Sequence, residues 1–182
     1  NNEVDYREQL DIGAEREVEP NPTPYYRALI GPNQWPSEDE LPRFRATVET
    51  FLGAAQTLSN QLLGLMSASL GLDVDHIQNV FGNDPQPYCK LIRYPPTPAG
   101  SRGVGAHKDS GLLTLLLQDE VGGLSAETPT GQWLDIAPIP DSLVVNIGEL
   151  LQIMTHNCFI AAPHRVTNAN AQTVRYSSAY FY

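Results

Sequence analysis

The sequence predicts a mainly β domain, a sandwich or jelly roll, supported by one long helix. From residue 86 onward, short apolar segments alternate with Gly, Pro and Asp, a pattern typical of sandwiches and jelly rolls. Upstream, apolar residues recur at the period of an amphipathic helix. A chain of 182 residues with 41% hydrophobic and 18% charged residues is long enough for one domain with a real core.

Residues 1–85 are expected to form a connector and helical support region. The run Glu19–Pro24 has a proline at every second position, which favours an extended connector. A second turn-rich segment spans Gly31–Pro36, and a short helix is expected around Tyr6–Leu10. Because the sequence begins at Asn1 rather than Met, we expect it to be part of a longer polypeptide.

A long amphipathic helix follows the connector. Its apolar positions alternate in steps of three and four: Leu41, Phe44, Val48, Phe51, Ala55, Leu58, Leu62 and Leu65. Gly71 is expected to end the helix. Ser37 with Glu40 offers a capping box, and Pro42 an alternative start. We expect this helix to brace one face of a sheet, with a short helix over 73–81 after it.

Residues 86–182 are expected to form the β core, in one structural unit with residues 1–85. The predicted strands are 87–94, 103–108, 111–118, 123–127, 132–136, 143–146, 163–167 and 174–182. A hairpin turn is expected at 128–131 and a short helix at 148–155. The predicted core is therefore a series of short strands that is interrupted once, by the short helix.

A His-x-Asp pair precedes the most apolar strand. His107 and Asp109 share one face if the chain is extended there, and Leu112–Leu117 behind them is apolar enough to be buried on both faces of a sheet. His164 is the leading third donor, and His156 competes with it. Two His and one carboxylate are the ligands of non-haem Fe(II) oxygenases, although an isolated His-x-Asp is also typical of a surface pair or a hydrogen-bonded core histidine.

Composition and charge exclude several classes of function. The net charge of -10 would repel nucleic acid and anionic membrane surfaces. No apolar stretch approaches the ~20 residues that span a bilayer, and no signal peptide stands at the start, so a cytoplasmic protein is expected. Cys89 and Cys158 fit neither a CxxC site nor a disulfide framework, and we interpret both as buried or half-buried thiols.

Several motifs occur together in a characteristic order. They are Arg93–Pro96, Gly105–Asp119, Gly122–Leu124, Gly131–Trp133, Leu143–Gly148, Pro163–Val166 and Arg175–Ser177. In this order the chain resembles the isopenicillin N synthase-like branch of the Fe(II)- and 2-oxoglutarate-dependent dioxygenases. The likeness covers residues 93–182, and Gly31–Pro36 and the long helix extend it upstream.

The resemblance implies a double-stranded β-helix, the jelly roll of this family, with Fe(II) held by His107, Asp109 and His164. The family's Pro-His-Arg-Val pattern favours His164 over His156. It also implies that Arg175 and Ser177 bind the distal carboxylate of 2-oxoglutarate. A guanidinium beside a hydroxyl on one strand face is a good carboxylate receptor.

The resemblance further implies that Tyr94 assists Arg175. One position departs from the pattern: many plant relatives have Asn where this chain has Ile92, so the co-substrate pocket is expected to differ in detail. Arg165 is expected to point away from the side occupied by His164.

The implied activity uses O2 to oxidise a small molecule by hydroxylation, desaturation or cyclisation, and the resemblance suggests amino-acid-derived or secondary-metabolite substrates. Three alternatives remain open. The first is an Fe(II) oxidase of the same fold that does not use 2-oxoglutarate. The second is a Zn(II) hydrolase with the same three ligands, and the third is a non-catalytic jelly-roll binding module.

Overall fold

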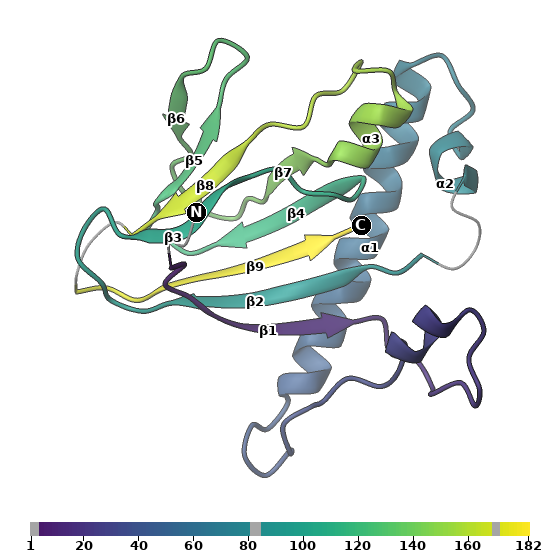
Figure 1. The fold of residues 1–182 in the computed structure, drawn as a ribbon, viewed down its shortest axis with the longest axis horizontal. Helices are drawn as coiled ribbons and strands as arrows, with labels where there is room; N and C mark the ends of the chain where they lie inside the picture. Colours follow the sequence, from purple (N-terminus) through teal and green to yellow (C-terminus); the bar gives the residue numbers. More distant parts are fainter. Residues whose placement is uncertain (1–3, 81–84, 169–171) are drawn as a thin grey trace. The chain divides into compact units, whose positions relative to one another are not determined.

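The structure is a computed structural model that describes residues 4–80, 85–168 and 172–182. The chain divides into two compact units, residues 1–11 with 89–182, and residues 12–88. The first unit contains most of the strands, and the second contains the long helix (Figure 1).

Two sheets make up the β structure. Its strands are β1 (Glu8–Gly13), β2 (Tyr88–Tyr94), β3 (Arg102–His107), β4 (Leu113–Gln118), β5 (Leu124–Glu127), β6 (Trp133–Asp135), β7 (Val144–Ile147), β8 (His164–Thr167) and β9 (Arg175–Phe181). One sheet has the order β1-β2-β9-β4-β7 and the other the order β3-β8-β5-β6. Apart from the hairpin of β5 and β6, neighbouring strands in each sheet come from distant parts of the sequence, as the predicted jelly roll requires.

The core of the first unit lies where the inner faces of the two sheets meet. One buried cluster contains Ile92 and Tyr94 from β2, Val104 from β3, Leu124 from β5 and Val166 from β8. Because the side chains of a strand alternate between its two faces, each strand contributes every second residue to such a core.

The predicted strands of the core are confirmed within two residues at their described ends. The helix expected around Tyr6–Leu10 is wrong, because this segment leads into the strand β1. Charge pairs support β1 beside β2: Arg93 Nη1 lies 2.8 Å from Glu8 Oε2, and Lys90 Nζ lies 3.3 Å from Asp11 Oδ2. Pairing with a distant strand therefore overrides the local helical tendency.

The second unit is built around α1 (Phe44–Ser69), with the 3-10 helix η1 (Tyr25–Leu29) and α2 (His76–Val80). The predicted long helix is confirmed, and Gly71 follows it with a φ of +75°, a conformation that favours glycine. Ser37 Oγ and Glu40 Oε2 do bond at 3.0 Å. However, this capping box closes a turn before α1 rather than capping the helix. The packing of the helix on the sheet stays a prediction.

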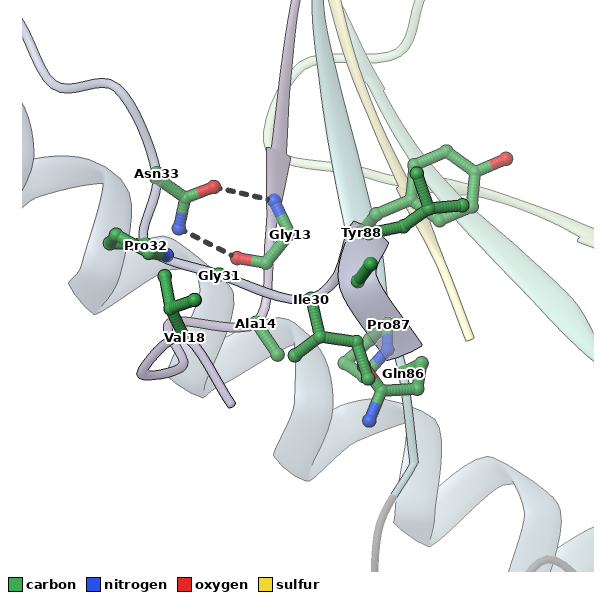
Figure 2. A pocket seen from close by; sticks show the side chains of 12 residues that line it. Gly13, Ala14, Val18, Ile30, Gly31, Pro32, Asn33, Gln86, Pro87 and Tyr88 are labelled. Carbon is green, nitrogen blue, oxygen red and sulfur yellow. Dashed lines mark hydrogen bonds between the residues drawn. The ribbon is translucent and has the colours of Figure 1, made fainter. Parts of the chain in front are cut away.

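A pocket of about 450 Å³ lies within the second unit (Figure 2). Asn33 connects two of its walls, since its side chain accepts from Gly13 N at 2.9 Å and donates to Gly13 O at 3.0 Å. None of the described residues that line it carries a charged side chain, so the chemistry-bearing groups lie elsewhere. Of the helices in the described ranges, none has the length and apolar character needed to cross a membrane.

Candidate active site

The pairing of β3 with β8 brings two histidines together. The strands are antiparallel, and His107 is the register partner of His164. The ring centroids lie 4.4 Å apart. Sheet pairing, rather than closeness in sequence, therefore places the two imidazoles side by side at the end of β3.

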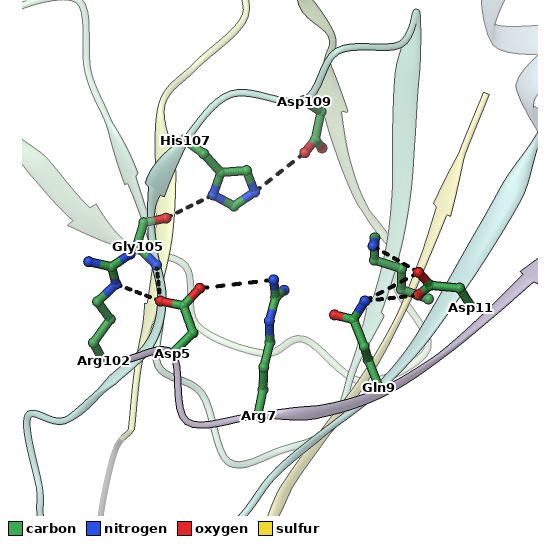
Figure 3. Close-up of polar contacts among 9 residues, drawn as sticks. Asp5, Arg7, Gln9, Asp11, Arg102, Gly105, His107 and Asp109 are labelled. Carbon is green, nitrogen blue, oxygen red and sulfur yellow. Dashed lines mark hydrogen bonds and ion pairs between the residues drawn. The ribbon is translucent and has the colours of Figure 1, made fainter. Parts of the chain in front are cut away.

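Asp109 completes a cluster of three potential metal ligands. Its Oδ1 lies 3.6 Å from Nε2 of His107 and 3.6 Å from Nε2 of His164, and one donor atom from each side chain lies within 4.8 Å of the others. The expectation that His107 and Asp109 share one face of an extended segment is corrected: β3 ends at His107, and Asp109 approaches from the loop that follows (Figure 3).

Both imidazoles are oriented through their second nitrogen. Nδ1 of His107 lies 2.8 Å from the carbonyl oxygen of Gly105, and Nδ1 of His164 lies 3.2 Å from that of Ala162. A proton on Nδ1 donates to this carbonyl and leaves the Nε2 lone pair free for a metal. Both Nε2 atoms face the same carboxylate oxygen, so the arrangement fits metal binding.

The second oxygen of Asp109 is held by two polar side chains. Thr114 Oγ1 donates to Oδ2 at 2.6 Å, and Asn146 Nδ2 donates to the same atom at 2.6 Å. Burial alone would raise the pKa of Asp109, but its contacts with His107, Thr114 and Asn146 outweigh burial and lower the pKa to about 2. Asp109 is therefore a carboxylate, with Oδ1 directed toward the histidines.

The two histidines differ in their electrostatic surroundings. The hydrogen bond with Asp109 raises the pKa of His107, although burial and, to a smaller extent, the positive charge of Arg7 oppose this rise. Burial lowers the pKa of His164, because the charged imidazolium loses its solvent. His164 thus favours the neutral form that a metal ligand requires.

The short helix α3 (Glu149–Met154) fixes the loop that carries Asp109. Glu149 N donates to the carbonyl oxygen of Asp109 at 2.7 Å, and Leu150 N donates to that of Ser110 at 3.3 Å. A Cβ on Gly148 would lie 2.0 Å from the carbonyl oxygen of Gly111, so only glycine permits this close approach. Backbone packing thus sets the position of the carboxylate.

The distances from Asp109 Oδ1 to the two Nε2 atoms suit a small divalent ion. Two donors that each lie about 2.1 Å from one ion are separated by roughly 3 to 3.5 Å, close to the observed 3.6 Å. Two neutral imidazoles and one carboxylate form the ligand set of non-haem Fe(II) centres and leave coordination positions open.

A buried arginine lies on the inner face of β9. Arg175 is only 2% exposed. Its Nη1 donates to Ser177 Oγ at 3.3 Å, and its Nη2 donates to Gln118 Oε1 at 3.1 Å. The guanidinium carbon lies 4.9 Å from the ring centroid of Tyr94. The structure therefore brings together the three residues for which the resemblance implies a role in co-substrate binding, Arg175, Ser177 and Tyr94.

The electrostatics of Arg175 favour an anionic ligand. Burial lowers the pKa of its guanidinium, which means that the positive charge is poorly solvated. Its Nε is buried and has no hydrogen-bond partner among the described residues. An incoming carboxylate would supply both the counter-charge and the missing acceptor.

Other candidates from the sequence lie outside this cluster. His156 is exposed in the turn after α3, with a φ of +48°. Arg165 stacks on Trp133, with its guanidinium carbon 4.0 Å from the ring centroid. Ile92, the position at which the sequence was expected to depart from the family's pattern, is buried in the core cluster and offers the co-substrate pocket no polar group.

Sequence reasoning missed three polar residues at the site: Thr114, Asn146 and Gln118. Each occupies a β strand that is otherwise largely apolar. A polar residue within an apolar strand was the available signal, since a buried polar group requires a partner. The hydrogen-bond partner of each of these residues could not be named before the strand order was known.

Comparison with known proteins identifies the family. Residues 85–182 match the model of the 2OG-Fe(II) oxygenase superfamily. The chain is 34% identical over 98% of its length to a 2-oxoglutarate-dependent dioxygenase, frbJ, of a Dothideomycetidae fungus, covering 50% of that protein. It is 33% identical over 86% of its length to the rice homoarginine-6-hydroxylase 2-ODD-233, covering 49% of it.

Solved structures support the same family. A full-length Neurospora crassa protein, crystallised in complex with alpha-KG, superposes with a TM-score of 0.81 at 31% identity, over 98% of this chain and 54% of that one. The fold is thus the predicted jelly roll of these oxygenases. The chain spans about half the length of the curated relatives it matches. It belongs to the 2OG-Fe(II) oxygenase superfamily.

Proposed function

We propose that the protein is an Fe(II)- and 2-oxoglutarate-dependent dioxygenase that oxidises a small-molecule substrate. One observation carries this proposal: Nε2 of His107 and Nε2 of His164 both lie 3.6 Å from the same oxygen of Asp109. An ordinary core histidine needs one hydrogen-bond partner, not a second imidazole directed at the same acceptor.

In the proposed enzyme, His107, Asp109 and His164 hold the metal. Bound there, Fe(II) would supply activation of O2, coupled to oxidative decarboxylation of 2-oxoglutarate to succinate and CO2 and to oxidation of the substrate. Arg175 and Ser177 bind the distal carboxylate of 2-oxoglutarate, and the ring of Tyr94 packs against the guanidinium. The burial of Arg175 and Ser177 keeps water from that carboxylate.

The substrate is proposed to be a small molecule, amino-acid-derived or a secondary metabolite. The relatives support this breadth, since one is named for homoarginine hydroxylation and the Neurospora protein was also solved with thymine. Whether the product is hydroxylated, desaturated or cyclised depends on how the pocket orients the reacting carbon. A cytoplasmic location stays a prediction.

The test is succinate formation. The protein is supplied with Fe(II), 2-oxoglutarate and O2, with and without a panel of small molecules, and succinate and O2 consumption are both measured. We expect succinate to form in proportion to the O2 consumed. The His164→Ala variant should lose this activity, whereas His156→Ala, at an exposed histidine outside the cluster, should keep it.

The three alternative functions predict different results in the same assay. O2 consumption without succinate would indicate an oxidase that does not use 2-oxoglutarate. Activity that survives iron chelation and requires Zn(II) would indicate a hydrolase. A non-catalytic binding module predicts no succinate and no functional difference between the wild-type protein and His107→Ala.

A further inference from the structure

Arg7, just before β1, lies on the side of the roll that carries the proposed metal site (Figure 3). The segment that carries it is tied to β3, because Tyr6 N donates to the carbonyl oxygen of Arg102 at 3.0 Å. Figure 3 shows the guanidinium of Arg7 directed to the side of the roll where His107 and Asp109 lie. Arg7 is thus a cationic group at the end of the roll that carries the three donors.

Contacts connect this segment to the histidine. Asp5 Oδ1 accepts from Gly105 N at 3.3 Å, and the carbonyl oxygen of Gly105 lies 2.8 Å from His107 Nδ1. Arg7 and the histidine are therefore separated by a short chain of contacts through Asp5 and Gly105.

Arg7 itself is loosely held. Its ion pair with Asp5 is long, with Nη2 3.9 Å from Oδ2. Asp5 already has a stronger partner, because Arg102 Nε lies 2.6 Å from Oδ1. Among the described residues, Arg7 makes no other ion pair, and its side chain is 28% exposed. A guanidinium has five N–H donors, so most of those of Arg7 remain available to a ligand.

Two guanidinium groups lie against one carboxylate in this segment. Asp5 is contacted by Arg7 at 3.9 Å and by Arg102 at 2.6 Å, although the chain as a whole has a net charge of -10. Because the contact of Arg7 is long and Asp5 is already held by a second arginine, the guanidinium of Arg7 can attract an anionic ligand.

We propose that Arg7 binds an anionic group of the substrate, most simply a carboxylate, and so selects acidic small molecules. This inference rests on the proposed function, since it names the substrate class of the same site. Arg7 is distinct from Arg175, which lies on β9 and binds 2-oxoglutarate in the proposed enzyme. A guanidinium gives two parallel hydrogen bonds to a carboxylate, so it would also fix the orientation of the substrate.

The experiment uses three probes of similar shape and different charge: phenylacetate, phenylacetamide and 2-phenylethylamine. The intact protein is loaded with Mn(II) and 2-oxoglutarate, and the paramagnetic relaxation of the ring protons of each probe is measured by NMR. We expect phenylacetate to bind near the metal about tenfold or more tightly than the amide. Arg7→Gln should remove this difference, and Arg7→Glu should shift the preference to the amine.

The matched control is Arg93→Gln. Arg93 also pairs with an acidic residue of the β1 segment, Glu8, but it precedes the core residue Tyr94 by one position, and neighbouring positions on a strand face opposite sides. Arg93 therefore faces away from the core, and the Arg93→Gln variant should leave the preference for phenylacetate unchanged. Equal relaxation of all three probes, including none for any, would overturn the inference. So would an anion preference that survives in Arg7→Gln, because the carboxylate would then be binding the metal itself.

Failure of the proposed function gives a different signal. Mn(II) binding is first followed through the relaxation of water protons, in the wild-type protein and in each variant. If the wild-type protein does not bind Mn(II), the proposed function fails and the inference fails with it. If Mn(II) and 2-oxoglutarate bind but the probes are not distinguished, the inference alone fails.

Discussion

At the scale of single residues, the position of Asp109 depends on two neighbours. Thr114 and Asn146 both donate to Oδ2 at 2.6 Å, which leaves Oδ1 to face the histidines. Loss of a residue that orients a metal ligand commonly weakens metal binding. We therefore regard Thr114 and Asn146 as positioning residues for the proposed metal ligand.

The Thr114→Val variant should bind Fe(II) about tenfold or more weakly, because Val has the shape of Thr without the hydroxyl. Thr114→Ser keeps the hydroxyl and should retain wild-type affinity. The measurement is an anaerobic Fe(II) titration of each variant. Equal affinity of the Val and Ser variants would show that this hydrogen bond does not position the carboxylate.

Replacement of Arg175 by Met should weaken 2-oxoglutarate binding about 10- to 100-fold and leave Fe(II) affinity unchanged. The reason is that the buried guanidinium supplies the positive charge for the distal carboxylate. Titration calorimetry with 2-oxoglutarate on the metal-loaded protein measures this. Arg45→Met, at an exposed arginine of α1 paired with Glu49, is the control, and a similar loss there would contradict the assignment.

The two cysteines should differ in reactivity. Burial raises the pKa of Cys89 to about 12, so its thiol stays protonated and inaccessible at pH 8. Cys158 is exposed, which corrects the expectation that both thiols are buried or half-buried. Iodoacetamide should modify Cys158 in the folded protein and Cys89 only after unfolding, as mass spectrometry can follow. Equal rates in the folded protein would contradict the burial of Cys89.

The residues at the site could be predicted from sequence only where a motif marks them. The three potential ligands occur in recognisable patterns, and so does the pair Arg175 and Ser177. The structure brings the three potential ligands together and places Arg175 beside Ser177. Gln118 could not be found in this way. Its contact with Arg175 exists because β4 pairs with β9, a neighbour relation that no local pattern encodes.

At the scale of elements, the contact between Gly148 and Gly111 fixes α3 against the loop of Asp109. In Gly148→Ala the new Cβ would meet the carbonyl oxygen of Gly111 at 2.0 Å and its carbonyl carbon at 2.5 Å. Backbone atoms cannot yield as a flexible side chain can. The loop would therefore have to shift.

We expect Gly148→Ala to lower the free energy of unfolding by about 1–3 kcal/mol and to weaken metal binding as well. Urea denaturation and metal titration measure the two effects. Gly53→Ala in α1 is the control, because nothing lies within 4 Å of its Cβ position, and it should be neutral or stabilising. A Gly148→Ala variant as stable as the wild type would mean that the loop adjusts at no cost.

The strands could be predicted well because apolar runs and turn residues alternate clearly between 86 and 182. The segment that forms β1 could not. Half of its residues are polar and most are exposed, and its strand conformation comes from its place at the edge beside β2. The capping box of Ser37 and Glu40 was recognised for its chemistry but assigned to the wrong element.

At the scale of the whole molecule, the chain folds back on itself. Residues 1–11 belong to the same compact unit as residues 89–182, and residues 12–88 form the other. Sequence analysis grouped residues 1–85 together because composition changes near residue 86. Contact between segments so distant along the chain depends on the completed fold, which local patterns do not report.

The central claim is that the three donors hold Fe(II) beside a bound 2-oxoglutarate. Anaerobic titration of the intact protein with Fe(II) and then 2-oxoglutarate tests it most directly, by following the weak visible charge-transfer band of the chelate. We predict a band that saturates at one equivalent of each in the wild-type protein and is lost in His164→Ala. A wild-type protein without the band, or a His164→Ala variant that keeps it, would contradict the account.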